Sequence, residues 1–179
     1  IILTYEHMPP DKKQIAIHES GHVLGHVLTG LPFSHVTINP NLLAVNSDGR
    51  SLGYVQPTLP YHTDEPFSYS RLSPDAFCNC FKEDVTIVGG YVAQRIFSKD
   101  FDRKGSKIDI KNLKNSPLIN QPEPFGSIYK KFLIAYTFQL FNLKINKQII
   151  LRIASELLKY GTLNSDQVKM IVDEITGEE

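Results

Sequence analysis

The residues most suggestive of chemistry are two histidines one helical turn apart, His18 and His22, with Glu19 directly after the first. Because residues i and i+4 of a helix lie on one face, the two imidazoles can bind one Zn²⁺ ion at about 2.0–2.1 Å. Glu19 lies about 100° further round the helix, where its carboxylate can accept a proton from a zinc-bound water. The H-E-x-x-H spacing therefore predicts two zinc ligands and a general base.

Chance is a weak explanation of this pattern. With six histidines and nine glutamates in 179 residues, an accidental H-E-x-x-H has a probability of about 1%. Apolar neighbours such as Ile17 and Val23 would bury the imidazoles, and a buried imidazole needs a polar partner. We therefore interpret the pair as a zinc site; the alternative is a histidine pair satisfied within the helix.

A catalytic zinc site needs a third protein ligand, and the residues alone leave its identity open. His26 lies on the same face but about 12 Å of axial rise from His18, too far for one ion. Leu28 occupies the position of the third histidine in the metzincin pattern, which excludes that class. A thermolysin-like site would use a glutamate from a later helix, for which Glu83 is the best-placed candidate.

Four segments resemble, in order, the peptidase domain of the FtsH-type AAA+ zinc proteases. Residues 15–22 read I-A-I-H-E-S-G-H and resemble that family's A-x-H-E-A-G-H helix, and residues 52–54 resemble its L-G-Y strand. Residues 88–97 read V-G-G-Y-V-A-Q-R-I-F and are similar to its G-G-R-A-A-E-x-x-F helix. Residues 105–110, G-S-K-I-D-I, resemble its G-A-x-x-D-L segment. The ATPase signature G-x-x-x-x-G-K-[ST] does not occur in the sequence.

The resemblance implies a zinc-dependent endopeptidase whose cofactor is Zn²⁺. Asp109 matches the family's ligand aspartate, so the resemblance implies His18, His22 and Asp109 as metal ligands and Glu19 as the catalytic base. Asp100 and Asp102 are weaker rivals of Asp109 and Glu83 a stronger one. A zinc-binding but catalytically inactive regulatory or adaptor domain is the alternative of another class, and the intact glutamate favours the enzyme.

Polypeptides are the expected substrates. A strand containing Gly53, Tyr54 and Val55 would present its backbone groups to an extended chain, a binding mode that tolerates many sequences. The resemblance also leaves room for an ATPase domain or subunit outside this chain, and for a homo-oligomer.

The elements that must position these residues predict a mainly α-helical fold, a helical zinc-metallopeptidase domain with a small flanking β-sheet. Start and stop signals predict helices at 12–29, 74–97, 107–115, 125–142, 145–160 and 164–176. Two β-rich runs, 35–38 and 51–56, predict an antiparallel pair around the turn residues 46–49. Residues 57–74 are a proline-rich loop and 98–106 a charged loop. Four aromatic residues, spaced by three or four along the fourth helix, are predicted to face the core: Phe125, Tyr129, Phe132 and Tyr136.

Length and composition limit the alternatives. A chain of 179 residues with 41% hydrophobic and 21% charged residues predicts one globular domain, 1–179. Its parts would be residues 12–57 with the zinc helix and sheet, 74–115 with the third-ligand segment, and the C-terminal helices of 125–176. Equal numbers of basic and acidic residues, 19 each, argue against a nucleic-acid partner. Two cysteines and the lack of a long apolar run predict a cytoplasmic protein, with a membrane anchor outside this chain left open.

Overall fold

The computed structural model describes residues 10–39, 53–58, 73–98 and 103–177. Within these ranges the fold is mainly helical, with one small sheet. The helices are α1 (Pro10–Thr29), α2 (Pro74–Phe97), α3 (Arg103–Asn112), the 3-10 helix η4 (Leu113–Asn115), α4 (Phe125–Phe141), α5 (Lys144–Tyr160) and α6 (Ser165–Thr176). The strands are β1 (Phe33–Thr37), β2 (Tyr54–Pro57) and β3 (Thr162–Asn164).

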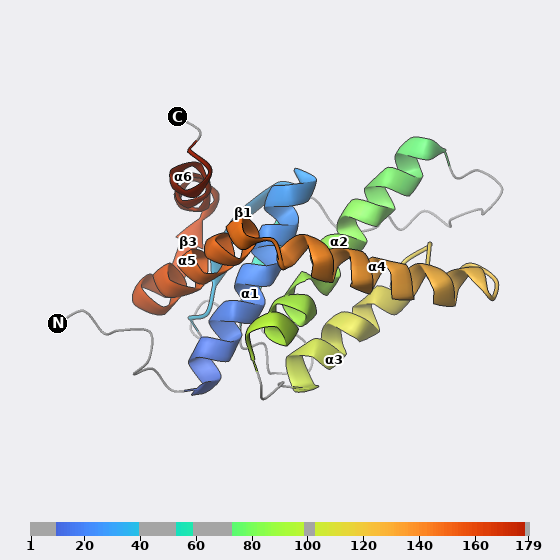
Figure 1. The fold of residues 1–179 in the computed structure, drawn as a ribbon, viewed down its shortest axis with the longest axis horizontal. Coiled ribbons are helices and arrows are strands. Elements are labelled where there is room, and N and C mark those ends of the chain that lie inside the picture. The colour runs from blue at the N-terminus through green and yellow to red at the C-terminus, as the bar shows by residue number, and fades with distance from the viewer. Residues whose placement is uncertain (1–9, 40–52, 59–72, 99–102, 178–179) are drawn as a thin grey trace.

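The helices pack around α1 and α2. In Figure 1, α4 and α5 cross in front of this pair, α3 lies below α4, and α6 lies at the left beside β1 and β3. Contacts between α1 and α5, α2 and α4, and α2 and α3 confirm that these neighbours touch. The core between them is aliphatic, with fully buried side chains such as Leu24, Leu133 and Ile150.

Two glycines allow α1 and α2 to approach closely. A Cβ atom added to Gly21 would lie 2.6 Å from the Cβ of Ala93, and one added to Gly89 would lie 2.5 Å from the carbonyl oxygen of Gly21. Two glycines at 89 and 90 should weaken an isolated helix by roughly 1 kcal/mol each relative to alanine. Here the close contact between α1 and α2 explains the glycine at 89.

The sheet is antiparallel with the order β2-β1-β3. Val36 of β1 pairs with Val55 of β2 on one side and with Leu163 of β3 on the other, and all three side chains are buried. The central strand is therefore the one that directly follows α1 and its turn, which ties the sheet to the helix carrying the histidines. β2 lies at an edge of this sheet.

The mainly helical fold with a small sheet is confirmed, and several boundaries differ from the predicted ones. The start of α2 is as predicted: Ser73 caps the helix by accepting a hydrogen bond from the backbone N–H of Ala76, and Pro74 is its first residue. The prediction of a loop over 98–106 is wrong from Arg103 onward, where α3 begins. Gly105 accordingly lies inside a helix and not at a turn before it.

The sheet is larger than predicted. We expected two strands, and β3 adds a third, which begins after the Gly161 C-cap of α5 and ends at Asn164, the N-cap of α6. A strand of three residues carries too little periodicity to be predicted from the sequence, and pairing with β1 makes one. The predicted turn at 46–49 lies outside the described residues.

The prediction that the aromatic series of α4 faces the core is wrong for three of its four members. Tyr129 is buried, but Phe125, Phe132 and Tyr136 are 48%, 53% and 41% exposed. The rings of Phe132 and Tyr136 pack against Phe81 of α2 at centroid distances of 6.3 and 5.5 Å. Because α4 is apolar on nearly every side, the spacing of its aromatic residues could not indicate which side of the helix faces the core.

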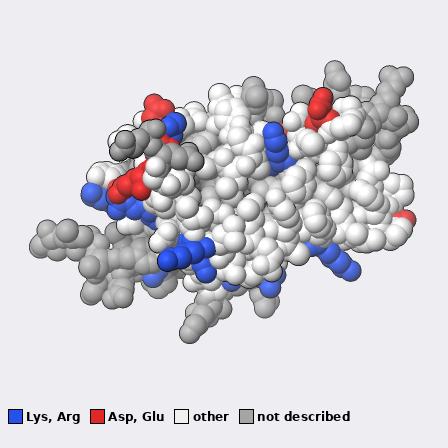
Figure 2. Space-filling model, turned by 45° about the horizontal axis from the view of Figure 1, so that its top comes forward, with Lys and Arg blue, Asp and Glu red and all other residues white. Residues whose placement is uncertain are grey.

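Charged side chains are mixed in sign over the face drawn in Figure 2. Blue and red groups alternate at its left end, and most of the remaining described surface carries neither. Oppositely charged side chains one helical turn apart form ion pairs in α5, between Arg152 and Glu156, and in α6, between Lys169 and Asp173. Among the described residues, every helix is too short or too polar to cross a lipid bilayer.

Candidate metal centre

Three side chains from two distant parts of the chain converge between α1 and α3. The Nε2 atoms of His18 and His22 are 3.1 Å apart. Asp109 places Oδ2 3.3 Å from His18 Nε2 and Oδ1 3.6 Å from His22 Nε2. In the described ranges, these residues form the group of histidine, cysteine and carboxylate side chains whose donor atoms lie close enough to share a metal ion.

The separations fit a small tetrahedral cation. Two ligands at 2.0–2.1 Å from a tetrahedral zinc lie about 3.3 Å from each other. The three separations in the structure, 3.1, 3.3 and 3.6 Å, scatter around this value. Two imidazoles and a carboxylate are also a donor set that zinc accepts, with a fourth position left for water or substrate.

The orientation of His22 is fixed from α2. Its Nδ1–H donates a hydrogen bond of 2.8 Å to the backbone carbonyl of Thr86. In the neutral ring this leaves the lone pair on Nε2, the atom that faces His18 and Asp109. A backbone carbonyl behind a ligating histidine is a common way to fix both tautomer and ring plane.

The pKa of His22 indicates that the site attracts positive charge. Burial by itself would lower this pKa, but the charge of Asp109 and a hydrogen bond to it, together with the charge of Glu19 and the Thr86 carbonyl, raise it to about 9. A proton and a metal ion are held by the same electrostatic field. The negative field of Asp109 therefore favours a cation between the two rings.

Asp109 itself is buried, with 7% of its surface exposed, and its Oδ2 accepts no hydrogen bond from the described residues. A buried carboxylate oxygen is costly without a donor or a cation. A metal ion at the point where the three side chains converge would satisfy this atom. The residues present therefore fit the metal that the sequence implies.

Glu19 is also buried, on the turn of α1 that carries His18. Burial raises the pKa of Glu19 to about 7, while the charge of His22 lowers it and that of Asp109 raises it. A carboxylate with a pKa near neutrality is suited to accept and return a proton. A cation held by the three neighbours would lower this pKa again.

Two glycines shape the walls of the site. A Cβ atom on Gly90 would lie 2.5 Å from Nε2 of His22 and 2.6 Å from Cε1 of His18. A Cβ atom on Gly53, just before β2, would lie 2.5 Å from Cγ of Glu19. The two imidazoles and the carboxylate therefore occupy space that any side chain at 90 or 53 would fill.

The strand proposed for substrate binding lies next to this site. Gly53 and Tyr54 are half-buried, and Val55 is buried and paired with Val36. The contact of Gly53 with Glu19 places the beginning of β2 beside the predicted base. The structure thus brings the expected strand and the expected base together.

The rival ligands lie elsewhere or cannot be placed. Glu83 is half-buried on α2 and does not belong to the group formed with the two histidines in the described ranges. His26 is buried; its Nδ1–H donates to the carbonyl of Leu31 at 3.0 Å, and burial lowers its pKa to about 4. Asp100 and Asp102 lie outside the described residues. The predicted helix 107–115 would place Asp109 on its first turn. Because α3 begins at Arg103, Asp109 lies on the second turn instead.

Thr86 and Gly90 are the site residues that sequence reasoning missed. Thr86 contributes only a backbone carbonyl, for which a sequence carries no signal. Gly90 had a signal, since a glycine pair inside a helix indicates close packing, but the sequence could not show that the closely packed group is the histidine pair. The structure adds both residues.

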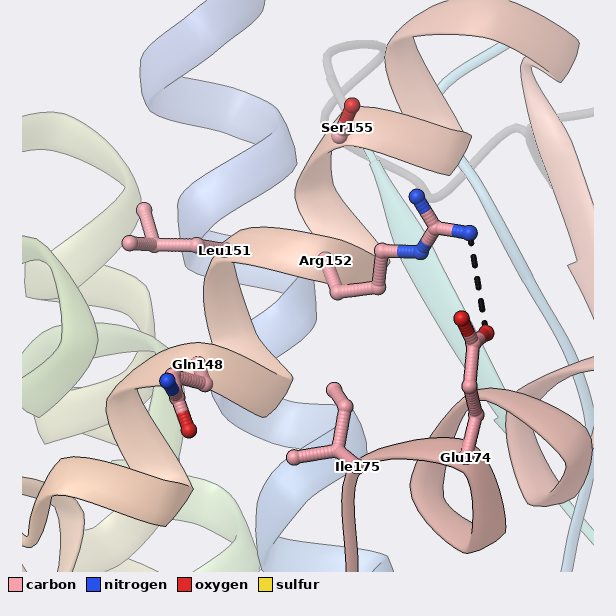
Figure 3. Close-up of a pocket in the computed structure, with 6 residues that line it drawn as sticks. All are labelled: Gln148, Leu151, Arg152, Ser155, Glu174 and Ile175. Atoms are coloured by element: carbon pink, nitrogen blue, oxygen red, sulfur yellow. Dashed lines mark ion pairs between the residues drawn. The ribbon is translucent and has the colours of Figure 1, made fainter.

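A hollow on the surface lies between α5 and α6, and Figure 3 shows its lining. It is an open surface groove of about 580 Å³ lined by Gln148, Leu151, Arg152, Ser155, Glu174 and Ile175. Its Arg152 and Glu174 form an exposed ion pair at 3.6 Å. Such a solvated pair contributes little to stability.

No protein-family model matches the sequence, and no curated protein is significantly similar to it. The resemblance to the FtsH-type peptidases therefore rests on the sequence motifs alone.

Proposed function

We propose that this chain is a zinc-dependent endopeptidase domain of the FtsH-type class. The observation that carries the proposal is the convergence of His18, His22 and Asp109 at ligand-like separations beside the buried carboxylate of Glu19. The two histidines come from adjacent turns of α1 and the aspartate from α3, so local helix geometry alone does not account for the cluster.

The proposed roles follow from the positions of the groups. His18, His22 and Asp109 would hold the ion. When bound, zinc supplies a Lewis acid that makes water more acidic and polarises the scissile carbonyl. Glu19 would accept a proton from the attacking water and return it to the leaving amine. The hydrogen bond from His22 to the Thr86 carbonyl keeps one ligand oriented throughout.

Polypeptide binding is assigned to β2 and the residues just before it. β2 is an edge strand in the described sheet, and an extended peptide could add to it through backbone hydrogen bonds. Gly53 lies against Glu19, so a peptide aligned with this strand would pass the base. An ATPase domain or subunit outside this chain and a homo-oligomer are further parts of this proposal.

Substituting Glu19→Gln tests the proposal directly. The amide keeps the size of the side chain but cannot act as a base, so zinc content should stay at one ion per chain while peptide cleavage falls by roughly 10²–10⁴-fold. Elemental analysis and cleavage of an unfolded polypeptide measure the two quantities. Glu174→Gln, at a side chain 67% exposed, is the matched control and should change neither.

The outcomes separate the candidates. Undiminished cleavage by Glu19→Gln would contradict the assignment of the base. A wild-type protein that binds one zinc ion and cleaves no unfolded polypeptide would instead support the inactive regulatory or adaptor domain. Protein that takes up no zinc at all would exclude both.

A further inference from the structure

A third buried carboxylate, in addition to those of Asp109 and Glu19, lies outside the metal cluster. Asp84 of α2 has none of its surface exposed, and its Oδ2 accepts two hydrogen bonds, one of 2.6 Å from the hydroxyl of Ser116 and one of 2.7 Å from the hydroxyl of Tyr129. Burial and the adjacent charge of Asp84 raise the pKa of Tyr129 above its usual range, so the phenol stays protonated and donates. Burying a carboxylate is costly unless such bonds compensate it.

The two donors belong to different segments. Tyr129 lies on α4, whereas Ser116 directly follows η4, in the stretch that continues from α3. Ser116 is also held within its own segment, because its N–H donates to the Leu113 carbonyl and its hydroxyl accepts from the N–H of Leu118. The side chains of Leu113 and Leu118 are buried as well. The segment after α3 is therefore bound to α2 by the hydrogen bond from Ser116 to Asp84, which lies among buried apolar side chains.

The two residues of this hydrogen bond are each close in sequence to a part of the metal cluster. Ser116 follows Asp109 by seven residues, through the last turn of α3 and η4. Asp84 precedes Thr86 by two residues, and the Thr86 carbonyl holds His22. One stretch of α2 thus supports both the ring of His22 and the segment that presents Asp109.

We propose that Asp84 is a positioning residue that holds Asp109 opposite His18 and His22 through its hydrogen bond with Ser116. This inference rests on the proposed function, because its consequence is the affinity for zinc. Apolar contacts around Leu113 would hold the segment in place without fixing its rotation. A directed hydrogen bond onto a buried oxygen fixes the rotation, and small errors in rotation are enough to misplace a ligand.

The two donors provide a matched pair of variants. Ser116→Ala and Tyr129→Phe each remove one hydroxyl from the same oxygen of Asp84, so both should lower the unfolding temperature. Only Ser116→Ala loosens the segment that carries Asp109. We expect it to weaken zinc binding at least tenfold in a competition titration with a chromogenic chelator, and Tyr129→Phe to stay within twofold of the wild type.

Hydrogen exchange of the metal-free proteins gives a second readout. In Ser116→Ala the amides of residues 107–115 should exchange faster than in Tyr129→Phe at matched temperature. Equal zinc affinities and equal exchange in the two variants would overturn the proposal and indicate a merely structural carboxylate. If the wild type binds no zinc, the proposed function fails, and the exchange comparison still decides whether Asp84 orders the Asp109 segment.

Discussion

Gly90→Ala should destroy the metal site while leaving the fold intact. The added Cβ atom would lie 2.5 Å from Nε2 of His22, whereas a carbon and a nitrogen in van der Waals contact lie about 3.4 Å apart. The ring nitrogen would have to move by about 0.9 Å. The added Cβ atom would make a second such contact with Cε1 of His18. Metal–ligand distances tolerate changes of only about 0.2 Å.

The expected loss is therefore large for zinc and small for stability. We expect zinc affinity to fall by about 100-fold or more, which corresponds to about 2.7 kcal/mol of binding free energy. The atoms that the new methyl group meets belong to the two imidazole rings and not to the backbone, so the strain falls on the metal ligands. Alanine also favours the helix over glycine by about 1 kcal/mol, so the metal-free variant should unfold at a temperature close to that of the wild type.

Chelator competition measures zinc affinity, and circular dichroism in the presence of EDTA measures unfolding. Asn79→Ala is the matched control, because it also improves helix propensity on α2 but at an exposed position. It should bind zinc as the wild type does. Gly90→Ala protein that kept wild-type zinc affinity and full cleavage would refute the placement of the ion between the two rings.

Two further predictions concern the remaining ligand and the buried histidine. Asp109→Ala should lower zinc affinity by about 100-fold or more and eliminate cleavage, whereas Glu83→Ala should stay within about twofold; the reverse ranking in a zinc titration would make Glu83 the ligand. The pKa of His26 is about 4 in the folded protein and near 6.5 when unfolded, so protonation favours unfolding. The neutral His26 ring therefore contributes its full share to the free energy of unfolding above pH 6.5. This share, roughly 3 kcal/mol in total, is lost as the pH falls towards 4. Urea unfolding at pH 7, 5.5 and 4.5 should show this loss in the wild type and not in His26→Gln, and identical pH profiles would contradict it.

The sequence by itself determined the local half of the site. His18, Glu19 and His22 lie within five residues of one helix, and helix geometry fixes which of them share a face. The beginning of α2 was equally predictable, because a serine cap and a proline in the first turn act through neighbouring backbone groups. Glycines 89 and 90 form a pair inside a helix, a local pattern that indicates close packing.

Only the tertiary structure decided what depends on distant segments. Asp109 lies 87 residues after His22. A motif resemblance suggested Asp109 as the third ligand, but it is the packing of α3 against α2 that brings it to the histidines. The carbonyl of Thr86 behind His22, and the hydroxyls of Ser116 and Tyr129 on Asp84, are contacts of chain segments that no local pattern relates. The same holds for the exposed side of α4: a helix that is apolar on nearly all sides does not specify its buried face, and its neighbours choose it.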